Sequence, residues 1–327
     1  MSSRLRRLLA RRARDAYLLA MRDGIRGLLI GFALAVTCAT GAMAVEEEQA
    51  AETRSCQPIA AAAPAWVTIC IRQAHYFRDT CSAIQFYAWR ERLPEGYFAR
   101  LIWQESRFDP HALSVAGAQG IAQFIPSTAR IRALRNPFDP TEALARSAEY
   151  LRFLSDKFGN LGLAAVAYNG GEGRAASYVA AAGYLPAETR YYVEVITGLA
   201  ADAWLGGDQQ VDYALSKSGI FVEDCLKLAA GEIVPRLDRP PSEWRPWGVM
   251  LAQDFSQGVA IRRFERVQAA HPEILGSEKL MLLMARNPSF GPRLRHFAMI
   301  GRDNRADAEA LCGKLQAAGA SCLVRKN

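Results

Sequence analysis

The sequence predicts an α+β chain in which a larger all-α part precedes a small βαββαβ part. Apolar residues recur at helical spacing through residues 80–231, and no stretch there alternates with a period of two. A stretch from Pro235 to Pro246, which contains four prolines, ends the helical pattern. Short strand-like and amphipathic segments follow it, which indicates a second, mixed domain over residues 245–327 after a linker over 232–244.

The helix that begins near Pro94 carries the most informative residue. Proline suits the first turn of a helix because its missing N–H has no partner there. Phe98, Leu101 and Ile102 follow at helical spacing and place Glu105 on the same apolar stripe. We therefore expect Glu105 to point into the core or a cleft. Burial there disfavours the charged form and raises the pKa of a carboxyl, as a general acid requires.

The other elements follow from capping signals and apolar spacing. Asp139 and Pro140 begin a helix that Gly159 ends. Further helices are expected over residues 163–168 and 188–204. The acidic and Ala-rich residues 45–79 predict a tether with a Cys-stapled end. In the C-terminal part we expect strands over 247–252, 279–285, 296–301 and 321–325 and helices over 258–270 and 306–318.

Residues 1–44 predict export. They carry eight arginines and two aspartates, and an uncharged run over 27–44 ends in Ala42-Met43-Ala44. This order is typical of a cleaved secretory signal peptide, with Met1 or Met21 as its start. We expect a periplasmic protein. Because the apolar run approaches the roughly 20 residues that a span needs, an uncleaved inner-membrane anchor is the alternative.

Without the leader the charge is nearly balanced. Subtracting eight basic and two acidic residues from 40 and 33 leaves 32 and 31, so the pI of about 9.1 does not indicate a nucleic-acid partner. Six cysteines remain, an even number that favours disulfides in an exported chain. There is no Cys-x-x-Cys pair and only four histidines, so no metal and no cofactor are expected. The pairing among four of the cysteines stays open: Cys56, Cys70, Cys81 and Cys225.

Cys312 and Cys322 are a separate case. Cys312 lies in the last predicted helix and Cys322 at the start of the following strand, with Gly319 between them for the turn. We expect these two thiols to pair and to join helix to sheet.

Four motifs resemble the family 1 lytic transglycosylases, which are related to goose-type lysozyme. They are the pair Glu105-Ser106, the stretch GAQGIAQFIPSTA over 117–129, the turn AYNGG over 167–171, and ETRYYV over 188–193. The second motif departs from the family where Ile121-Ala122 replaces the usual Leu-Met, a change in the side chains expected to form the wall of the subsite.

The resemblance implies a lysozyme-like domain over 80–231 that cleaves the β-1,4 bond between N-acetylmuramic acid and N-acetylglucosamine and closes a 1,6-anhydro ring. Glu105 would be the only catalytic carboxyl, because Asp109 before Pro110 is expected to cap a turn. The implied substrate-binding residues are Ser106, Gln123, Tyr168, Asn169 and Tyr192, and the loop glycines are Gly117, Gly120 and Gly170. For Ser106 a purely local capping role is an equal alternative.

The C-terminal part resembles the SPOR domain in its βαββαβ order and in the segment over 301–312. That resemblance implies binding to peptidoglycan glycan strands stripped of stem peptides, often at division sites, with cell-wall or division proteins as possible partners. Two other functions stay open: a muramidase that hydrolyses the same bond, and a wall-binding scaffold without activity. Endo or exo action and stem-peptide preference are not indicated.

Overall fold

The computed structural model describes residues 53–58, 68–217, 219–286 and 293–327. All of them belong to one compact unit, Ala50–Asn327. The signal peptide or anchor expected over residues 1–44 lies outside the described residues. Within the described ranges, no helix is long and apolar enough to cross a membrane.

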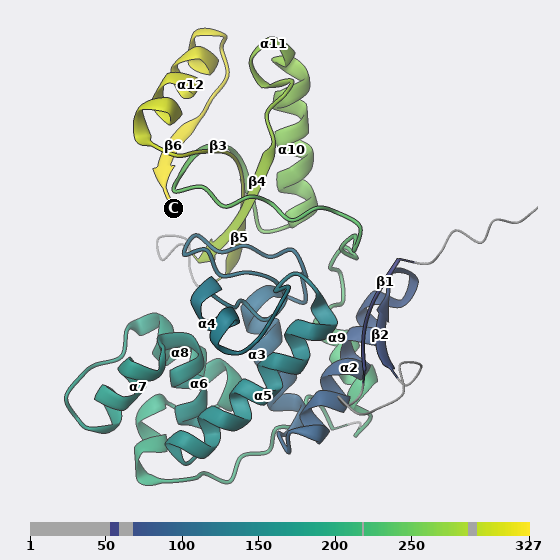
Figure 1. Cartoon of the computed structure of the whole chain (residues 1–327), viewed down its shortest axis with the longest axis vertical. Helices are drawn as coiled ribbons and strands as arrows, with labels where there is room; N and C mark the ends of the chain where they lie inside the picture. The colour runs from purple at the N-terminus through teal and green to yellow at the C-terminus, as the bar shows by residue number, and fades with distance from the viewer. Residues whose placement is uncertain (1–52, 59–67, 218, 287–292) are drawn as a thin grey trace, which may run out of the picture. The chain divides into compact units, whose positions relative to one another are not determined.

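The first part of the unit is built from helices around one apolar core (Figure 1). Its largest buried side chains include Trp204, Tyr97, Phe98 and Tyr192. Its helices are α2 (Tyr76–Arg90), α3 (Glu95–Ser106), α4 (Pro126–Ile131), α5 (Pro140–Phe158), α6 (Leu161–Gly170), α7 (Glu172–Val179), α8 (Ala187–Thr197) and α9 (Phe221–Leu228), with the 3-10 turns η1 (Gln73–His75) and η2 (Ala201–Gly206).

A β-hairpin precedes these helices, where the sequence predicted a tether. β1 (Arg54–Pro58) and β2 (Thr68–Arg72) pair in antiparallel fashion, and Cys56 lies opposite Cys70 and is disulfide-bonded to it. Ile71 is fully buried, and both strands contact α5. The predicted cysteine staple is confirmed by this disulfide, but the described residues of the segment form a packed hairpin and not a tether, because the short strands are stabilised by contacts with distant helices and by the disulfide. A second disulfide, Cys81–Cys225, joins α2 to α9.

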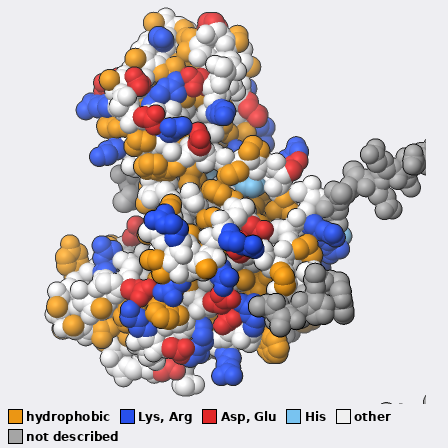
Figure 2. Space-filling view, viewed as in Figure 1, with side chains coloured by type: hydrophobic (Ala, Val, Ile, Leu, Met, Phe, Trp, Pro, Cys, Tyr) orange, Lys and Arg blue, Asp and Glu red, His pale blue; other side chains and the backbone are white. Residues whose placement is uncertain are grey.

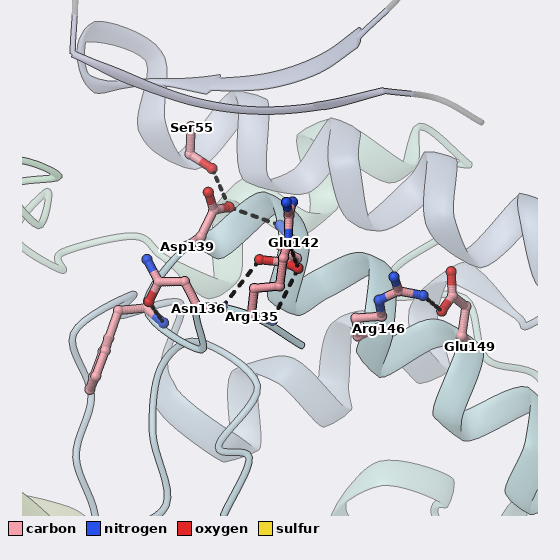
Figure 3. A network of polar contacts seen from close by, with 8 residues as sticks. Ser55, Arg135, Asn136, Asp139, Glu142, Arg146 and Glu149 are labelled. Atoms are coloured by element: carbon pink, nitrogen blue, oxygen red, sulfur yellow. Dashed lines mark hydrogen bonds and ion pairs between the residues drawn. The ribbon is translucent and has the colours of Figure 1, made fainter. Parts of the chain in front are cut away.

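A polar network ties the hairpin to the start of α5 (Figure 3). Ser55 Oγ donates to Asp139 Oδ1 at 2.7 Å, and the same oxygen accepts the backbone N–H of Glu142 at 2.9 Å, so Asp139 is the N-cap. The Glu142 carboxylate accepts from the backbone N–H groups of Arg135 and Asn136 at 3.1 and 3.2 Å. The loop before α5 is thereby fixed from both sides.

Helix ends agree with the sequence prediction for α5 and differ for α8. Asp139 begins α5, and Gly159 ends it with a left-handed φ of 88°. The helix predicted over 188–204 stops at Thr197, and the chain resumes as η2 after Gly198, whose φ is 76°. The prediction of one long helix was wrong because Gly198 forms a C-cap. Thr197 Oγ1 also accepts the backbone N–H of Leu199 at 3.2 Å.

The second part has the predicted order of strands and helices, with one additional turn of helix. Its elements are β3 (Trp247–Asp254), α10 (Gln257–Ala270), α11 (Pro272–Leu275), β4 (Leu280–Arg286), β5 (Leu294–Arg302), α12 (Arg305–Ala317) and β6 (Leu323–Lys326). The strands form one antiparallel sheet in the order β4-β5-β3-β6. A disulfide between Cys312 and Cys322 joins α12 to the segment before β6, with 5.8 Å between the Cα atoms.

The two faces of this sheet bury different sets of side chains. Val249, Leu282 and Ile300 pack with residues of the helices, such as Phe264 and Leu315. The alternate positions of β4 and β5 form a separate apolar cluster on the other face: Met281, Leu283, Phe297 and Met299. Both faces of the sheet are therefore apolar.

The proline-rich segment between the two parts is held by side chains on both sides. Gln73 donates from Nε2 to Pro235 O at 3.0 Å and accepts from the backbone N–H of Leu237 at 2.6 Å. Further along, Ser242 Oγ accepts the backbone N–H of Leu282 at 3.1 Å. This segment is a fixed strap across both parts. On the face drawn in Figure 2, basic and acidic side chains are interspersed.

Candidate active site

Glu105 lies near the C-terminal end of α3 and lines a cleft of about 490 Å³. Its side chain is half-buried, so it faces the cleft and not the core. α3 ends because Arg107 and Phe108 adopt left-handed backbone angles, with φ of 55° and 63°. This reversal returns the chain beside α3, so the following loop forms one side of the cleft.

Tyr192 contacts the acid directly. Its hydroxyl donates a hydrogen bond to Glu105 Oε1, and its side chain projects from the buried face of α8 with an exposed fraction of 2%. Burial, and then the charge of Glu105, hold the pKa of Tyr192 well above its usual value. The phenol therefore keeps its proton at neutral pH and stays a donor to the carboxyl group.

Tyr168 lines the same cleft from α6. Its hydroxyl donates to Ala122 O at 2.8 Å and lies 2.9 Å from Ser147 Oγ. Burial, and then Glu105, raise the pKa of Tyr168 well above its usual value. Tyr168 thus shapes the cleft and holds the loop at Ala122.

Gln123 lines the cleft with its side-chain N–H groups already engaged. Nε2 donates to Ala112 O at 3.1 Å and to Gly120 O at 2.9 Å, and the backbone φ is 50°. The amide nitrogen therefore stabilises the loop, and Oε1 is the atom suited to accept an N–H from a substrate. This division of roles is finer than the one predicted.

Asn169 lies near the end of α6 and also lines the cleft. Its Oδ1 accepts from Thr189 Oγ1 at 2.8 Å, which links α6 to α8. The side chain is therefore held in a fixed orientation, beside the turn predicted from the sequence.

Ser106 does not line the cleft. It is fully buried, and its Oγ donates to Ile121 O at 2.7 Å. The side chain joins the end of α3 to the following loop through Ile121 O, and its Oγ also lies 3.5 Å from Ile102 O, one helical turn earlier. The hydroxyl is therefore engaged within the protein, and a contact of Ser106 with substrate stays a prediction.

Gly120 and Gly171 are the glycines that the backbone requires most clearly. Gly120 has a φ of 75°, and a Cβ there would lie 1.7 Å from Pro137 O. Gly117 also has a positive φ, of 78°. Gly170, which was predicted to make the turn, is the last residue of α6, and the positive φ of 87° belongs to Gly171.

Glu188 was missed as a candidate. It is exposed in the first turn of α8 and lines the cleft, so two carboxyl groups line the cleft among the described residues: Glu105 and Glu188. The sequence contained a signal for it, because Glu188 precedes Tyr192 by four positions and so shares its helix face.

Asp109 lies outside the cleft and caps a turn as expected, since its Oδ1 accepts the backbone N–H of His111 at 2.9 Å.

Three residues of the C-terminal part also line the cleft: Met284, Ala285 and Leu294. Nothing in the sequence indicated them, because they lie far from the motifs. Across the described ranges, no three His, Cys, Asp or Glu side chains gather where they could hold a metal ion.

Comparison with known proteins gives matches to part of the chain. A 77-residue segment is 35% identical to the protein named Transglycosylase of Enterobacteria phage PRD1, and the match covers 24% of this chain and 29% of that protein. This chain thus matches less than a third of the length of that relative.

Two solved structures also match, each at 25% identity and a TM-score of 0.32. They are an inactive mutant of the lytic transglycosylase Slt from Pseudomonas aeruginosa, with 40% of this chain and 25% of that chain covered, and the 70 kDa soluble lytic transglycosylase of Escherichia coli, with 38% and 23% covered. Residues 82–190, which contain Glu105, Gln123, Tyr168 and Asn169, match the family described as Transglycosylase SLT domain.

Proposed function

We propose that this chain is an exported, periplasmic peptidoglycan lytic transglycosylase. The observation that carries the proposal is Glu105 in a cleft with the buried phenol of Tyr192 donating to its carboxyl group. The match of residues 82–190 to the SLT domain supports the same reaction class. The proposed substrate is the β-1,4 bond between N-acetylmuramic acid and N-acetylglucosamine.

In the first step Glu105 gives its proton to the glycosidic oxygen. The bond between that oxygen and C1 of N-acetylmuramic acid breaks, and the electron pair leaves with the N-acetylglucosamine oxygen. The acetamido group of the muramic sugar stabilises the positive charge at C1. Tyr192 stabilises the carboxylate that this step leaves on Glu105, because its hydrogen bond is stronger to the charged form.

In the second step the Glu105 carboxylate takes the proton of the muramic C6 hydroxyl. The C6 oxygen bonds to C1, a 1,6-anhydro ring closes, and Glu105 is protonated again. No water is consumed. General acid–base assistance contributes on the order of 10²–10⁴-fold, so the cleft must also hold C6 close to C1.

Gln123 and Asn169 are the proposed ligands of the sugar substituents. Both side chains are oriented by hydrogen bonds to the protein, Gln123 by Gly120 O and Asn169 by Thr189. Side chains held in this way lose little further freedom when a substrate binds. They suit the acetamido groups of the glycan, which offer one N–H and one C=O each.

Glu188 favours a second candidate function, a muramidase. Hydrolytic glycosidases generally use two carboxyl groups across the bond, one as acid and one as base or nucleophile. Glu188 lines the same cleft as Glu105 and could activate a water. The two functions differ in their products, since hydrolysis leaves a reducing muramic acid and the transglycosylase reaction leaves a 1,6-anhydro end.

The test is to incubate residues 45–327 with peptidoglycan sacculi and to determine the released products by mass. We expect 1,6-anhydromuramic ends. Glu105→Gln should remove nearly all release, while Glu188→Gln should retain the product type. Glu95→Gln is the matched control, because Glu95 lies on the same helix and outside the cleft.

The outcomes separate the alternatives. Reducing muramic ends that vanish in Glu188→Gln would establish the hydrolase. Full activity of Glu105→Gln would overturn the site, and binding to sacculi without any release by the wild type would favour a scaffold.

We also propose that the C-terminal part binds glycan in a groove of its own. The groove, of about 700 Å³, is lined by residues of β3, of α10 and of the segment before β6. The lining includes the basic side chains of Arg263 and Arg266, His271, and the apolar Leu251 and Val267. Cationic and apolar groups side by side suit sugar hydroxyls and C–H faces. The βαββαβ order supports the same assignment, by its resemblance to SPOR domains.

Retention on amidase-stripped sacculi tests this groove. Arg266→Ala should elute at lower salt than the wild type and should need a higher sacculus concentration for half-maximal retention. Arg262→Ala is the control, because it is exposed on the same helix and outside the groove. Equal retention of both variants and the wild type would remove the groove from consideration.

A further inference from the structure

The outer edge of β4 contacts the loop that follows α3. β4 lies at one end of the sheet, so one of its edges has no strand partner there. The backbone N–H of Met284 donates to Leu113 O at 2.8 Å, and Ser114 and Met284 form an isolated parallel bridge. The loop therefore adds to the sheet edge as a short strand would.

The contact continues in the side chains. Leu113 is 1% exposed and belongs to one buried cluster with Met281, Leu283, Phe297 and Met299, on the sheet face opposite the helices. If this face were free, a contiguous apolar patch would be exposed to water. The packing of Leu113 against it therefore stabilises the association of the two parts.

Two polar contacts fix the same arrangement from other elements. Gln257 of α10 donates from Nε2 to Asp109 Oδ2 at 2.5 Å. Trp244 of the proline-rich strap donates from Nε1 to Val115 O at 3.2 Å. β4, α10 and the proline-rich segment thus all contact the loop that follows α3. Three contacts from three elements fix both the position and the orientation of the C-terminal part against this loop.

This arrangement brings C-terminal side chains into the cleft of Glu105. Met284, Ala285 and Leu294 line it next to Ser114, and Met284 and Leu294 are 4% and 5% exposed. We propose that these three residues form an apolar subsite for the methyl-bearing substituents of the glycan strand. The C-terminal part would then bind substrate within the catalytic cleft itself. This inference rests on the proposed function.

The chemistry of the glycan gives the subsite its ligand. Its methyl groups sit on the acetamido groups of both sugars and on the lactyl ether of N-acetylmuramic acid. Gln123 and Asn169 are polar and can bind the amide atoms of a substituent. A methyl group contributes binding free energy only where it leaves water for an apolar surface. Met284, Ala285 and Leu294 offer such a surface in the cleft.

Binding measured in the Glu105→Gln background tests the subsite without turnover. Two probes are titrated by calorimetry: N-acetylglucosamine oligomers, which carry acetamido methyls only, and peptide-free peptidoglycan glycan fragments, which carry lactyl methyls as well. We expect Met284→Ala to weaken binding of at least one probe by about tenfold. Leu282→Ala is the matched control, since it shortens a buried side chain of the same strand that does not line the cleft.

Weaker binding of the N-acetylglucosamine oligomers, with or without weaker binding of the glycan fragments, supports an acetamido methyl in the subsite. Weaker binding of the glycan fragments alone supports the lactyl methyl. Equal affinities in Met284→Ala and Leu282→Ala overturn the inference. If Met284→Ala does not fold, Ala285→Gln fills the subsite from its edge and should weaken binding in the same way. Failure of the proposed function is separate, because it appears as absent 1,6-anhydro products from the wild type.

Discussion

At the scale of single residues, hydrogen-bond partners decide which motif residues can reach a substrate. Ser106 belongs to the motif of Glu105, yet its hydroxyl donates to Ile121 O and the side chain is buried. Gln123 uses its N–H groups on the backbone and retains Oε1 for the cleft. The sequence singles out such residues but cannot tell these roles apart, because the partners lie on a loop whose path depends on the fold.

Tyr192→Phe should lower the turnover of glycan by about 10- to 100-fold, because a hydrogen bond to a charged carboxylate contributes about 1.5–3 kcal/mol. The alkaline limb of the activity profile should move to higher pH, since the variant no longer stabilises the charged form of Glu105. Rates across pH check both effects. Tyr191→Phe is the control, because Tyr191 is 39% exposed on the same helix. An unchanged limb in Tyr192→Phe would contradict the proposed role of the phenol.

At the scale of elements, the sequence predicts regular structure where local signals agree. Asp139 and Gly159 fix both ends of α5, as expected from their capping preferences. Local sequence signals do not predict the secondary structure where contacts between distant segments or the local backbone determine it. The β1–β2 hairpin depends on a disulfide and on α5, and the helix predicted over 188–204 is interrupted because the local backbone of Gly198 outweighs the apolar spacing that continues to Trp204.

Gly120, in the loop between α3 and α4, and Gly171, at the end of α6, give a matched pair of glycine substitutions. Gly120→Ala forces an alanine into a left-handed backbone conformation and places its Cβ in a steric clash with Pro137 O. The substitution should lower the free energy of unfolding by about 2–5 kcal/mol. Gly171→Ala adds the left-handed alanine alone, because no atom lies within 4 Å of its Cβ, and should cost about 1 kcal/mol. Denaturant unfolding compares the two. Equal losses of unfolding free energy in the two variants would mean that the loop moves away from Pro137 without a loss of stability.

At the scale of the whole molecule, the sequence suggests two independent domains joined by a linker, and the structure adds a contact that no motif encodes. The proline-rich segment is bonded to Gln73 and to Leu282, and β4 meets the loop at Leu113. Such contacts depend on surface complementarity between distant segments, which apolar spacing cannot reveal. The sequence gives one sign of these contacts. Residues on both faces of β4 and β5 are apolar, whereas a sheet face that no helix covers is otherwise expected to be polar.

His296 of β5 makes this arrangement sensitive to acid. Burial, and then the positive charge of Arg107, lower the pKa of His296 from 6.5 to about 4, while Asp254 opposes the shift. Asp109 and Glu232 line the same small cavity as His296. The folded state therefore binds fewer protons at this site than the unfolded state between these two values. This contribution to stability is complete above pH 6.5 and is lost as the pH falls toward 4.

Between pH 7 and pH 4.5 the loss should be about 2–3 kcal/mol of unfolding free energy from His296 alone. His296→Gln keeps a polar side chain that does not titrate, so the variant should lose less stability than the wild type over this interval by that amount. Urea unfolding at the two pH values measures the difference, and carboxyl groups remote from His296 that titrate in the same range cancel in the comparison. His75→Gln, at an exposed histidine of η1, is the control and should follow the wild type. Parallel losses in His296→Gln and the wild type would show that the buried imidazole does not set the acid sensitivity.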